Sequence, residues 1–396
     1  MRERPYDIVL FGATGFTGTL VAAYLARAAG RERFRWALAG RSQEKLAAVL
    51  RVVHAIDPQA APALLIADIS DAASLTAMAE NTRVLITTVG PYLRYGEGVL
   101  RACVEAGTHY VDLTGEPEFV DRSRAAWHET ARARGLRIIH CCGFDSIPHD
   151  LGALFTLDTL RTHMGEDAFR HADITMRGFL EFDAAFSGGT WNSAIEQLSR
   201  ARQYLDARRT AANGRAPFER VHALPVRLHY NRLLQRWACP LPSVDPQVVR
   251  QSARLRGDYG QTFAYGHFLL AEHLLPVLAG IAGIGAVAMM AQFKPTANLL
   301  RKARQSGEGP SPEKRAASWF RVLFVAQAGN HEVSCEVSGG DPGYDETAKM
   351  LAESALCLAL DTDLPPHAGV VTPAAGMGHA LIRRLENAGM RFTVVR

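Results

Sequence analysis

Three glycines near the amino terminus, Gly12, Gly15 and Gly18, recur at three-residue spacing in the stretch YDIVLFGATGFTGTL. A β-branched and aromatic run over residues 6–11 precedes them, and a helix-periodic segment from about Thr19 follows. Strand, glycine turn and helix in that order form a dinucleotide-binding pattern. The glycines permit the tight turn, the close approach of backbone to pyrophosphate and the packing of helix on strand, and the N–H groups of the helix terminus face the phosphates. The cofactor-contacting residues expected in this loop are Gly12, Thr14, Gly15, Phe16, Thr17 and Gly18.

The next expected strand, in RWALAGRSQEKL, distinguishes between the two nicotinamide dinucleotides. Gly40 is followed by Arg41, Ser42 and, one turn later, Lys45. An NAD site usually carries a carboxylate at the end of this strand for the ribose hydroxyls, whereas a guanidinium, a hydroxyl and an ammonium suit a 2′-phosphate. The sequence therefore predicts NADP(H), bound in part by Arg41, Ser42 and Lys45.

Further strands and helices alternate up to about residue 143. PALLIADIS predicts a third strand ending at Asp68, a position suited to contacting adenine, and RVLITTVGPY predicts a fourth, followed by a helix over 96–106. THYVDL and LRIIHCCG predict two more strands. Alternation of this kind predicts a doubly wound parallel sheet, a Rossmann domain of the α/β class, with ligands beyond the carboxyl ends of its strands. The cofactor contacts added by these loops are Asp68, Val89, Gly90 and Pro91.

Composition sets the context for this domain. The chain has 396 residues, of which 48% are hydrophobic and 21% charged, with a net charge of +4, so we expect two globular domains. Its six cysteines include no CxxC pair, and the adjacent Cys141 and Cys142 are poorly placed to chelate one ion. The amino terminus lacks the apolar core and cleavage site of a signal peptide. We expect a cytoplasmic protein in a reducing compartment, with no metal site.

Basic residues are concentrated in one stretch. Twelve arginines and no lysine lie between Arg200 and Arg256, against Asp206, Glu219 and Asp245. This pattern is typical of a solvated helical surface, and it also fits a docking face for an acidic partner or anionic lipid. No aromatic stacking platform is interleaved with the arginines, so we expect no nucleic-acid partner.

Several long motifs resemble a known family. GATGFTG, GRS, TTVGPYLRYGEGVLRACVEAGTHYVDLTGE and GFDSIPHDLG are similar to the saccharopine dehydrogenase-like oxidoreductases, and most similar to the branch called trans-acting enoyl reductases. FSGGTWNSAIEQ, GPSPEKRAASWFRV, VSGGDPGYDETAKMLAESALCLA and GVVTPAAGMGHALIRRLENAGM extend the resemblance, least clearly around 205–300. These motifs identify a family far more specifically than they identify a substrate.

The resemblance implies an architecture and an activity. It implies an NADP-binding Rossmann domain over 1–148, a mixed α/β substrate domain over 149–364 containing an apolar run at 274–293, and a segment over 365–396 that returns to the Rossmann domain. The activity it implies is reduction of a carbon–carbon double bond in a polyketide chain during lipid biosynthesis. Saccharopine reductases proper instead reduce an imine formed between two amino acids.

The second half of the chain shows its own local signals. Residues 172–182 and 318–328 have strand composition, and Gly329-Asn330 between alternating flanks predicts a two-residue hairpin. Apolar periodicity predicts helices over 190–209 and 344–360. These elements fit a domain of sheet and helices.

The run LLPVLAGIAGIGAVAMM, residues 274–290, contains no charge and approaches the length of a membrane span. A crossing would separate the Gly329-Asn330 hairpin from the strand over 172–182, so we do not expect one. A buried core helix is one interpretation. A helix that lines an acyl pocket, or that dips into a membrane surface with Lys294, Arg301, Lys302 and Arg304 on anionic headgroups, is the other.

Enoyl reduction needs donors aimed at a developing oxyanion and one acid. Tyr92 and Ser146 are candidate donors, together with backbone N–H groups of CGFDSIP, and Asp145 would orient a donor or hold the nicotinamide carboxamide. Each also has a structural alternative: Pro91 and Tyr92 would only shape the cofactor loop, and Asp145 would only cap a helix from about Pro148. His140 is expected to be a core or strand-end histidine.

These observations favour an NADPH-dependent oxidoreductase acting on a small-molecule or carrier-bound acyl chain. One alternative is an amino-acid C–N oxidoreductase of the saccharopine type, which requires convergent Arg and Lys for its carboxylates. The other is a non-catalytic NADPH-binding protein of lipid surfaces. Peripheral membrane contact through 274–293 and a homodimer are the further associations left open.

Overall fold

The computed structural model describes residues 4–184, 220–241, 243–291, 296 and 310–396. The helix expected over 190–209 lies outside these residues. The chain forms two compact units. Unit 1 comprises Met1–Leu151 and Gly340–Met390, and unit 2 comprises Gly152–Gly339 and Arg391–Arg396.

Unit 1 is built on a seven-stranded parallel sheet with the order β14-β6-β5-β4-β1-β2-β3. The strands are β1 (Tyr6–Phe11), β2 (Trp36–Gly40), β3 (Ala63–Ile66), β4 (Thr82–Thr87), β5 (His109–Asp112), β6 (Arg137–Ile139) and β14 (Gly369–Val371). β1 lies between β2 and β4, where the direction of the strand order reverses. The doubly wound sheet predicted from the alternation of strands and helices is confirmed, with β14 as an additional strand.

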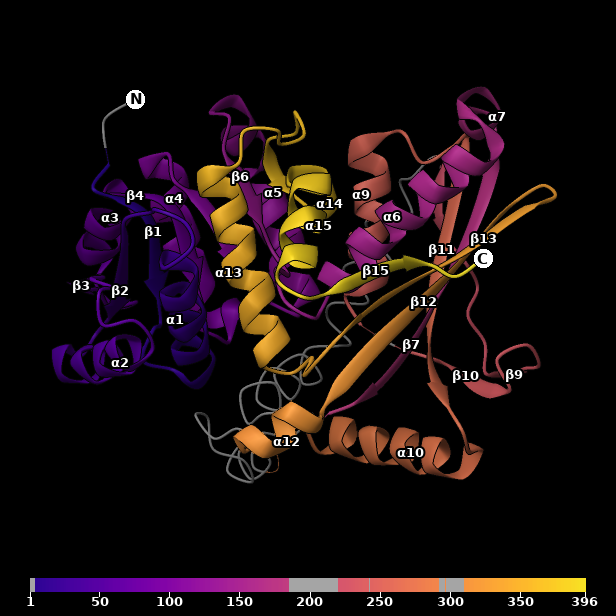
Figure 1. Ribbon diagram of the computed structural model, residues 1–396, viewed down its shortest axis with the longest axis horizontal. Coiled ribbons are helices and arrows are strands. Elements are labelled where there is room, and N and C mark those ends of the chain that lie inside the picture. Colours follow the sequence, from indigo (N-terminus) through magenta and orange to yellow (C-terminus); the bar gives the residue numbers. More distant parts are fainter. Residues whose placement is uncertain (1–3, 185–219, 242, 292–295, 297–309) are drawn as a thin grey trace. The chain divides into compact units, whose positions relative to one another are not determined.

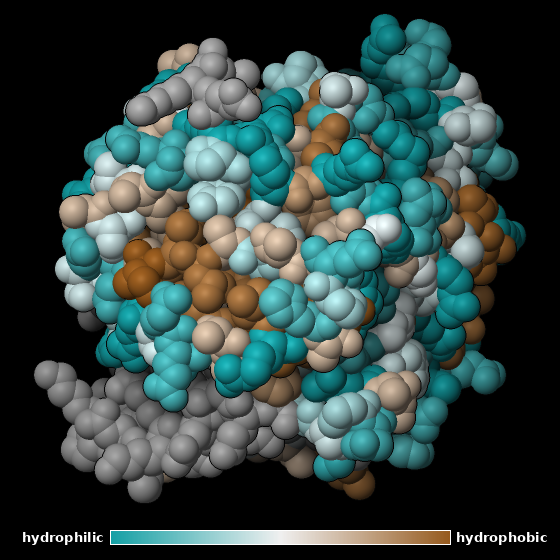
Figure 2. Space-filling model, turned by 60° about the vertical axis from the view of Figure 1, so that its left-hand side comes forward, coloured by the Kyte–Doolittle hydropathy of each residue, from teal (hydrophilic) through white to brown (hydrophobic). Residues whose placement is uncertain are grey.

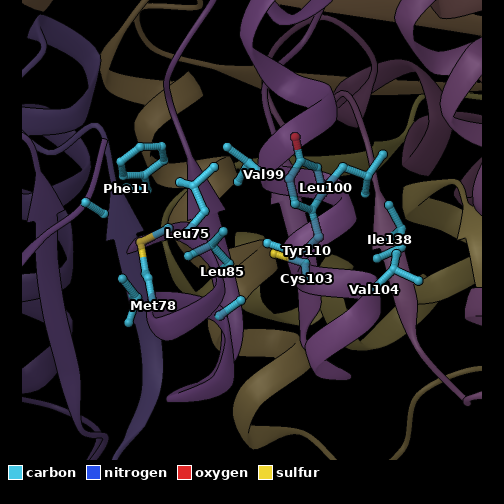
Figure 3. Packing of buried hydrophobic residues seen from close by; sticks show 14 of the residues in the cluster. Phe11, Leu75, Met78, Leu85, Val99, Leu100, Cys103, Val104, Tyr110 and Ile138 are labelled. Carbon is cyan, nitrogen blue, oxygen red and sulfur yellow. The ribbon is translucent and has the colours of Figure 1, made fainter. Parts of the chain in front are cut away.

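Helices cover both faces of this sheet (Figure 1). The helices of unit 1 are α1 (Phe16–Ala29), α2 (Gln43–Ile56), α3 (Ala72–Glu80), α4 (Tyr92–Ala106), α5 (Pro117–Ala133), α13 (Asp345–Leu360), α14 (Pro373–Gly376), α15 (Gly378–Asn387) and the first turn of α6 (Ile147–Met164). α1 packs beside α2 and α13 on one face, and α4 packs beside α3 and α5 on the other. Figure 3 shows the core under α3 and α4, where Leu75, Val99 and Cys103 lie over Leu85 and Tyr110.

The strands of this sheet are buried on both faces, which explains why their sequences are continuous runs of apolar residues. Ile8, Val9 and Leu10 of β1 are all fully buried, because helices cover both faces of the sheet. Two expected boundaries differ. β3 ends at Ile66, before Asp68, and α4 begins at Tyr92 rather than at residue 96, because a buried carboxylate caps its first N–H groups.

Unit 2 contains an eight-stranded mixed sheet with the order β15-β13-β12-β7-β11-β10-β9, and β8 also pairs with β11. Its strands are β7 (Asp173–Asp183), β8 (Val221–Ala223), β9 (His229–Asn231), β10 (Arg236–Pro240), β11 (Thr262–Ala271), β12 (Trp319–Ala328), β13 (His331–Gly339) and β15 (Arg391–Val394). β12 and β13 pair antiparallel with Ala328 opposite His331. The predicted hairpin at Gly329-Asn330 is therefore confirmed.

The two faces of this sheet differ. On one face Phe324 of β12 packs so closely on α6 that a Cβ added to Gly152 would lie 2.3 Å from its ring. The opposite face carries stacked Phe179 and Phe268, with ring centroids 5.5 Å apart, and half-buried Leu323 and Val325 beside them. The remaining helices of unit 2 are α7 (Glu166–Arg170), α9 (Asp245–Arg256), α10 (Leu274–Ala291) and α12 (Pro312–Ala317).

The unit boundaries differ from the ranges 149–364 and 365–396 expected from the resemblance. α13 lies in unit 1, because it packs on α1 and over β1, β4 and β5. β15, near the carboxyl terminus, lies in unit 2, because it pairs with β13. The apolar run of the sequence forms α10, whose large side chains Leu275, Leu278 and Met289 are exposed. The interpretation of this run as a buried core helix is therefore wrong for the side chains that the structure describes. Among the helices that the structure describes, none is long and apolar enough to cross a membrane.

Candidate functional site

The loop after β1 depends on two of its glycines. Gly12 has a φ of +87°, and a Cβ on it would lie 2.6 Å from Oγ1 of Thr88. A Cβ on Gly18 would lie 2.1 Å from the carbonyl oxygen of Gly12. Gly12 therefore lets the loop rest against the end of β4, and Gly18 lets α1 start directly on the loop. Both are requirements of a dinucleotide-binding turn.

The amino terminus of α1 is suited to an anion. Gly15 is its exposed N-cap, no side chain caps it, and its first turn contains no acidic residue. Thr14, Phe16 and Thr17 are half-buried around it. The positive end of the helix dipole favours phosphate at a terminus that no side chain caps.

The corresponding terminus of α4 is already occupied. The carboxylate of Glu116, fully buried, accepts hydrogen bonds from the backbone N–H groups of Tyr92 at 3.0 Å and Leu93 at 2.8 Å. A second anion at this position would be repelled by that carboxylate. The two helices that flank the point where the strand order reverses thus differ, and only α1 presents an open terminus to a pyrophosphate.

Polar side chains follow β2 as expected. Arg41 and Lys45 are exposed, and the hydroxyl oxygen of Ser42 accepts a hydrogen bond from the N–H of Lys45, which makes Ser42 the N-cap of α2. Neither Asp nor Glu stands at the end of the strand to receive ribose hydroxyls. The arrangement has the charge and the donors for a 2′-phosphate.

Asp68 lies in the loop after β3. Its carboxylate accepts hydrogen bonds from the N–H and the hydroxyl of Ser70, and these bonds, with a smaller contribution from the charge of Arg41, lower the pKa of Asp68. Ile66, the exposed last residue of β3, and half-buried Ile69 provide apolar surface nearby in sequence. Figure 2 shows the surface of unit 1 that is turned forward. This surface is mostly hydrophilic and carries one apolar patch. This edge of the sheet can receive an adenine ring.

The loop after β4 is attached to the glycine loop. The hydroxyl of Thr88 donates to the carbonyl of Gly12 at 3.1 Å, and Val89, Gly90 and Pro91 follow with partial or full exposure. Val89, Gly90 and Pro91 therefore follow a residue that is bonded to the glycine loop, and their contact with the cofactor stays a prediction.

Tyr92, the next residue, lies inside the core. It is 4% exposed, its hydroxyl donates to the carbonyl of Thr87 at 3.1 Å, and burial raises its pKa. This geometry favours the structural alternative for Tyr92, in which it shapes the loop from within, over a role as proton donor.

The loop after β6 holds unusual backbone. Cys141 and Ser146 have φ values of +61° and +125°, in the region that L-residues rarely adopt. Non-glycine residues in this conformation cluster at functional sites, where the surroundings stabilise the strain. Asp145 is exposed and its carboxylate lies over Gly115, where an added Cβ would be 2.7 Å away, while Ser146 is fully buried. Of the two, Asp145 is the one that can reach a bound molecule.

A buried acid joins the loops after β5 and β6. Asp112, fully buried, accepts hydrogen bonds from the N–H groups of Cys141 and Thr114 and from the hydroxyl of Tyr110. His140 Nδ1 lies 2.7 Å from the same carboxylate, which confirms the expectation of a strand-end histidine. Asp112 and Glu116 were not among the expected site residues, although both stand in the quoted motif THYVDLTGE.

The carboxyl-terminal part of unit 1 also contributes to this edge. The hydroxyl of Thr347, on α13, accepts a hydrogen bond from the N–H of Phe144 at 3.1 Å. Tyr344 packs edge to face on Phe16, with ring centroids 5.0 Å apart. The glycine loop and the loop after β6 are thus both supported by residues that lie more than two hundred positions further along the chain. No local pattern indicates such contacts.

Comparisons with known proteins place these features in a family. The model of the saccharopine dehydrogenase NADP-binding domain matches residues 8–139. The chain is 37% identical over 419 residues to a Mycobacterium tuberculosis protein provisionally named a trans-acting enoyl reductase, with 99% of this chain and 98% of the relative covered. It is 35% identical over 421 residues to the trans-acting enoyl reductase of Mycobacterium bovis, with 100% and 99% covered.

One solved structure shows a similar fold over the whole chain. It is a saccharopine dehydrogenase (L-Glu forming) from Saccharomyces cerevisiae, with a TM-score of 0.55, 11% identity, and 99% of this chain and 100% of that chain covered. At this identity the likeness concerns the fold alone.

Proposed function

The chain belongs to the saccharopine dehydrogenase-like oxidoreductases, in their trans-acting enoyl reductase branch, and from this premise we propose that it reduces a carbon–carbon double bond in a polyketide or lipid-like acyl chain. The coarser statement, that the protein is an NADP-dependent oxidoreductase, follows from the family itself. The observation that carries the proposal is the similarity to trans-acting enoyl reductases over the full length of the chain, substrate half included.

The residues of unit 1 fit the cofactor that the family implies. A Cβ at position 12 or 18 would fill the turn, α1 has no side-chain cap, and Arg41 and Lys45 stand where a 2′-phosphate would be bound. The pyrophosphate would be held at the amino terminus of α1, where Gly15 itself donates its N–H to the carbonyl of Gly12, and the nicotinamide half by the loops after β4 and β6. When bound, NADPH supplies a hydride.

The chain itself must supply the polar groups that this reduction needs. As the double bond is reduced, negative charge develops on the thioester carbonyl oxygen and a proton must reach the α-carbon. In the loop Cys142–Ser146 the N–H groups of Cys142, Phe144 and Ser146 already donate within the protein, so the N–H of Gly143 would be the backbone donor to that oxygen. Exposed Asp145 would orient a donor or hold the carboxamide of the cofactor. Because Tyr92 and Ser146 are buried, we assign them the support of these loops.

Unit 2 supports an apolar substrate. The face of its sheet that points away from α6 has Phe179, Phe268, Leu323 and Val325 at its centre. A sheet face that met only water would carry polar side chains there. Two arginines of this sheet, Arg236 and Arg321, are both ion-paired with Glu181. These features suit an acyl chain better than a substrate with several carboxylates.

The test is NADPH consumption against two panels, enoyl thioesters of increasing chain length and imines of amino acids with keto acids. We expect oxidation of NADPH with enoyl thioesters and a higher kcat/KM for longer chains. Turnover with the imines alone would establish the saccharopine-type reaction instead. Tight binding of NADPH without turnover on either panel would identify a non-catalytic NADPH-binding protein.

A further inference from the structure

The turn after β6 is held by one buried acid. Asp112 is fully buried at the end of β5, and its carboxylate accepts the N–H of Cys141 at 3.1 Å. Its backbone carbonyl accepts the N–H of Cys142 at 2.7 Å. Cys141 has a φ of +61°, which L-residues adopt only where the surroundings stabilise it. Asp112 therefore fixes both residues at which the chain leaves the sheet.

The carboxylate of Asp112 is itself fixed in orientation. The hydroxyl of Tyr110 and the N–H of Thr114 donate to it at 2.9 Å and 3.1 Å, and Nδ1 of His140 lies 2.7 Å away. Together with the N–H of Cys141, these donors fill the acceptor capacity of an ionised carboxylate. β5 and β6 already pair as strands through their backbones. The carboxylate is thus not needed to join the two strands, and its distinct effect is on the turn.

Gly143, the next residue of the turn, has an N–H group that is available to a ligand. Gly143 is buried, and an added Cβ would lie 3.2 Å from Cγ2 of Thr347 and 3.4 Å from Cβ of Leu113. Among the residues that the structure describes, no acceptor takes its N–H, whereas the N–H groups of Cys142 and Phe144 on either side both donate. Buried N–H groups without an acceptor are rare, because they cost free energy. An incoming acceptor would satisfy this one.

We propose that Asp112 is a positioning residue, which holds the turn at Cys141 so that the N–H of Gly143 meets the carbonyl oxygen of the acyl substrate. This inference rests on the proposed enoyl reduction, in which negative charge develops on that oxygen. A donor stabilises such charge best when it is held in place before the reaction, because it then needs no reorientation during the step. Asp112 is fully buried, so it acts through the backbone rather than by contact with the substrate.

The test compares Asp112→Ala with the wild type for turnover of an enoyl thioester of N-acetylcysteamine and for binding of NADPH. We expect kcat to fall roughly 100-fold, the usual effect of losing one oxyanion donor. KM should hardly change, because the donor acts mainly on the transition state. The Kd of NADPH should stay near the wild-type value, because its phosphates would be bound at α1 and after β2. Asp112→Asn should recover most of kcat, since its amide oxygen can still accept the N–H of Cys141.

The matched control is Glu353→Ala, which removes another buried carboxylate of unit 1, one that accepts from Tyr24 and pairs with Arg384. This variant should lower the free energy of unfolding and leave kcat of the folded protein unchanged. Should Asp112→Ala fail to fold, Asp112→Glu keeps the charge but moves the carboxylate by one methylene. It should lower kcat by roughly tenfold or more, because the N–H of Gly143 is displaced with the turn.

Three outcomes would overturn the inference. The first is a wild-type kcat in Asp112→Ala, or in Asp112→Glu where that variant is used. The second is a loss of NADPH binding in parallel with the loss of kcat, because Asp112 would then only support the dinucleotide fold. The third is an absence of wild-type turnover with the thioester, which would refute the proposed function itself and is thereby distinguished from the other two.

Discussion

At the scale of single residues, the cofactor loop depends on glycines, because the space around them leaves no room for a Cβ atom. A Cβ at position 18 has no room, because the carbonyl oxygen of Gly12 would lie 2.1 Å from it. Position 30, at the end of α1, has a right-handed φ of −72°, and the nearest atom to an added Cβ is 3.6 Å away. The two glycines should therefore respond oppositely to the same substitution.

Gly18→Ala should lower the free energy of unfolding by about 1–3 kcal/mol, the usual cost of overpacking, and should weaken NADPH binding because the loop must shift. Gly30→Ala should leave binding unchanged and stabilise the protein slightly, since it only restricts the unfolded chain. Urea denaturation and titration of NADPH fluorescence measure both. Equal behaviour of the two variants would contradict the assignment of Gly18 to the packing of α1 on the loop.

Arg41→Ala should raise the Kd of NADPH by roughly 10- to 100-fold, since a charge-assisted bond to the 2′-phosphate contributes about 1.5–3 kcal/mol. The Kd of NADH should hardly change. Arg51→Ala, at an exposed arginine of α2, is the control for a general loss of positive charge. If Arg41→Ala weakened both dinucleotides equally, Arg41 would not bind the 2′-phosphate.

The residues of the site fall into two groups, those whose surroundings lie within one short stretch of sequence and those whose contacts lie far along the chain. Gly12 to Gly18 and Arg41 were predictable, because one strand, one turn and one helix define their surroundings within a short stretch. Glu116 and Thr347 were not, because their roles consist of hydrogen bonds to N–H groups 23 or 24 and 203 positions away. A buried carboxylate that caps a distant helix leaves no periodic signal in the sequence.

At the scale of elements, unit 1 is held together partly by charge. Arg384 of α15, only 13% exposed, pairs with Asp361, with Glu353 of α13 and with Glu32 after α1, and Glu353 also accepts from Tyr24 of α1. This cluster fixes the carboxyl-terminal helices to the first helix of the dinucleotide fold.

Arg384→Met should destabilise the protein by about 3–5 kcal/mol, because it leaves the buried carboxylate of Glu353 without its cation. Arg383→Met removes a half-exposed arginine that pairs with exposed Asp363, and should change the free energy of unfolding by less than about 1 kcal/mol. Denaturation of the two variants in parallel gives the comparison. A small effect at both positions would show that the cluster does not fix α13 and α15.

The pairing of β5 with β6 includes a titratable group. His109 Nδ1 accepts the N–H of Arg137, and burial, reinforced by the charges of Arg137 and Arg83, lowers the pKa of His109 from 6.5 to about 4. Between these values the unfolded chain binds a proton that the folded chain does not. Stability should therefore fall as the pH drops from 6.5 to 4, by at most about 3 kcal/mol from this group.

His109→Asn, whose side-chain oxygen can accept the same N–H, should remove this contribution. Its free energy of unfolding should depend less steeply on pH below 6.5 and match the wild-type slope above it. Urea titrations across the range measure the difference. Identical slopes in that window would show that His109 is not held neutral in the fold.

At the scale of the whole molecule, the chain crosses between its units more often than local patterns reveal. The parallel sheet was predictable because strands and helices alternate, and the β12–β13 hairpin because Gly329-Asn330 joins two alternating runs. β14 and β15 are strands of three and four residues whose partners, β6 and β13, are chosen by tertiary contact. The same limit applied to α10, since an apolar run does not by itself show whether protein or another medium surrounds it.

The central claim is that this NADP-dependent enzyme reduces a carbon–carbon double bond. The most direct measurement uses NADPH deuterated at nicotinamide C4 and an enoyl thioester, followed by mass spectrometry and NMR of the product. The account predicts a saturated thioester with one deuterium at the β-carbon and a solvent-derived hydrogen at the α-carbon. Transfer of deuterium only to the carbon atom bonded to nitrogen, in the amine formed from an amino-acid imine, would contradict this claim.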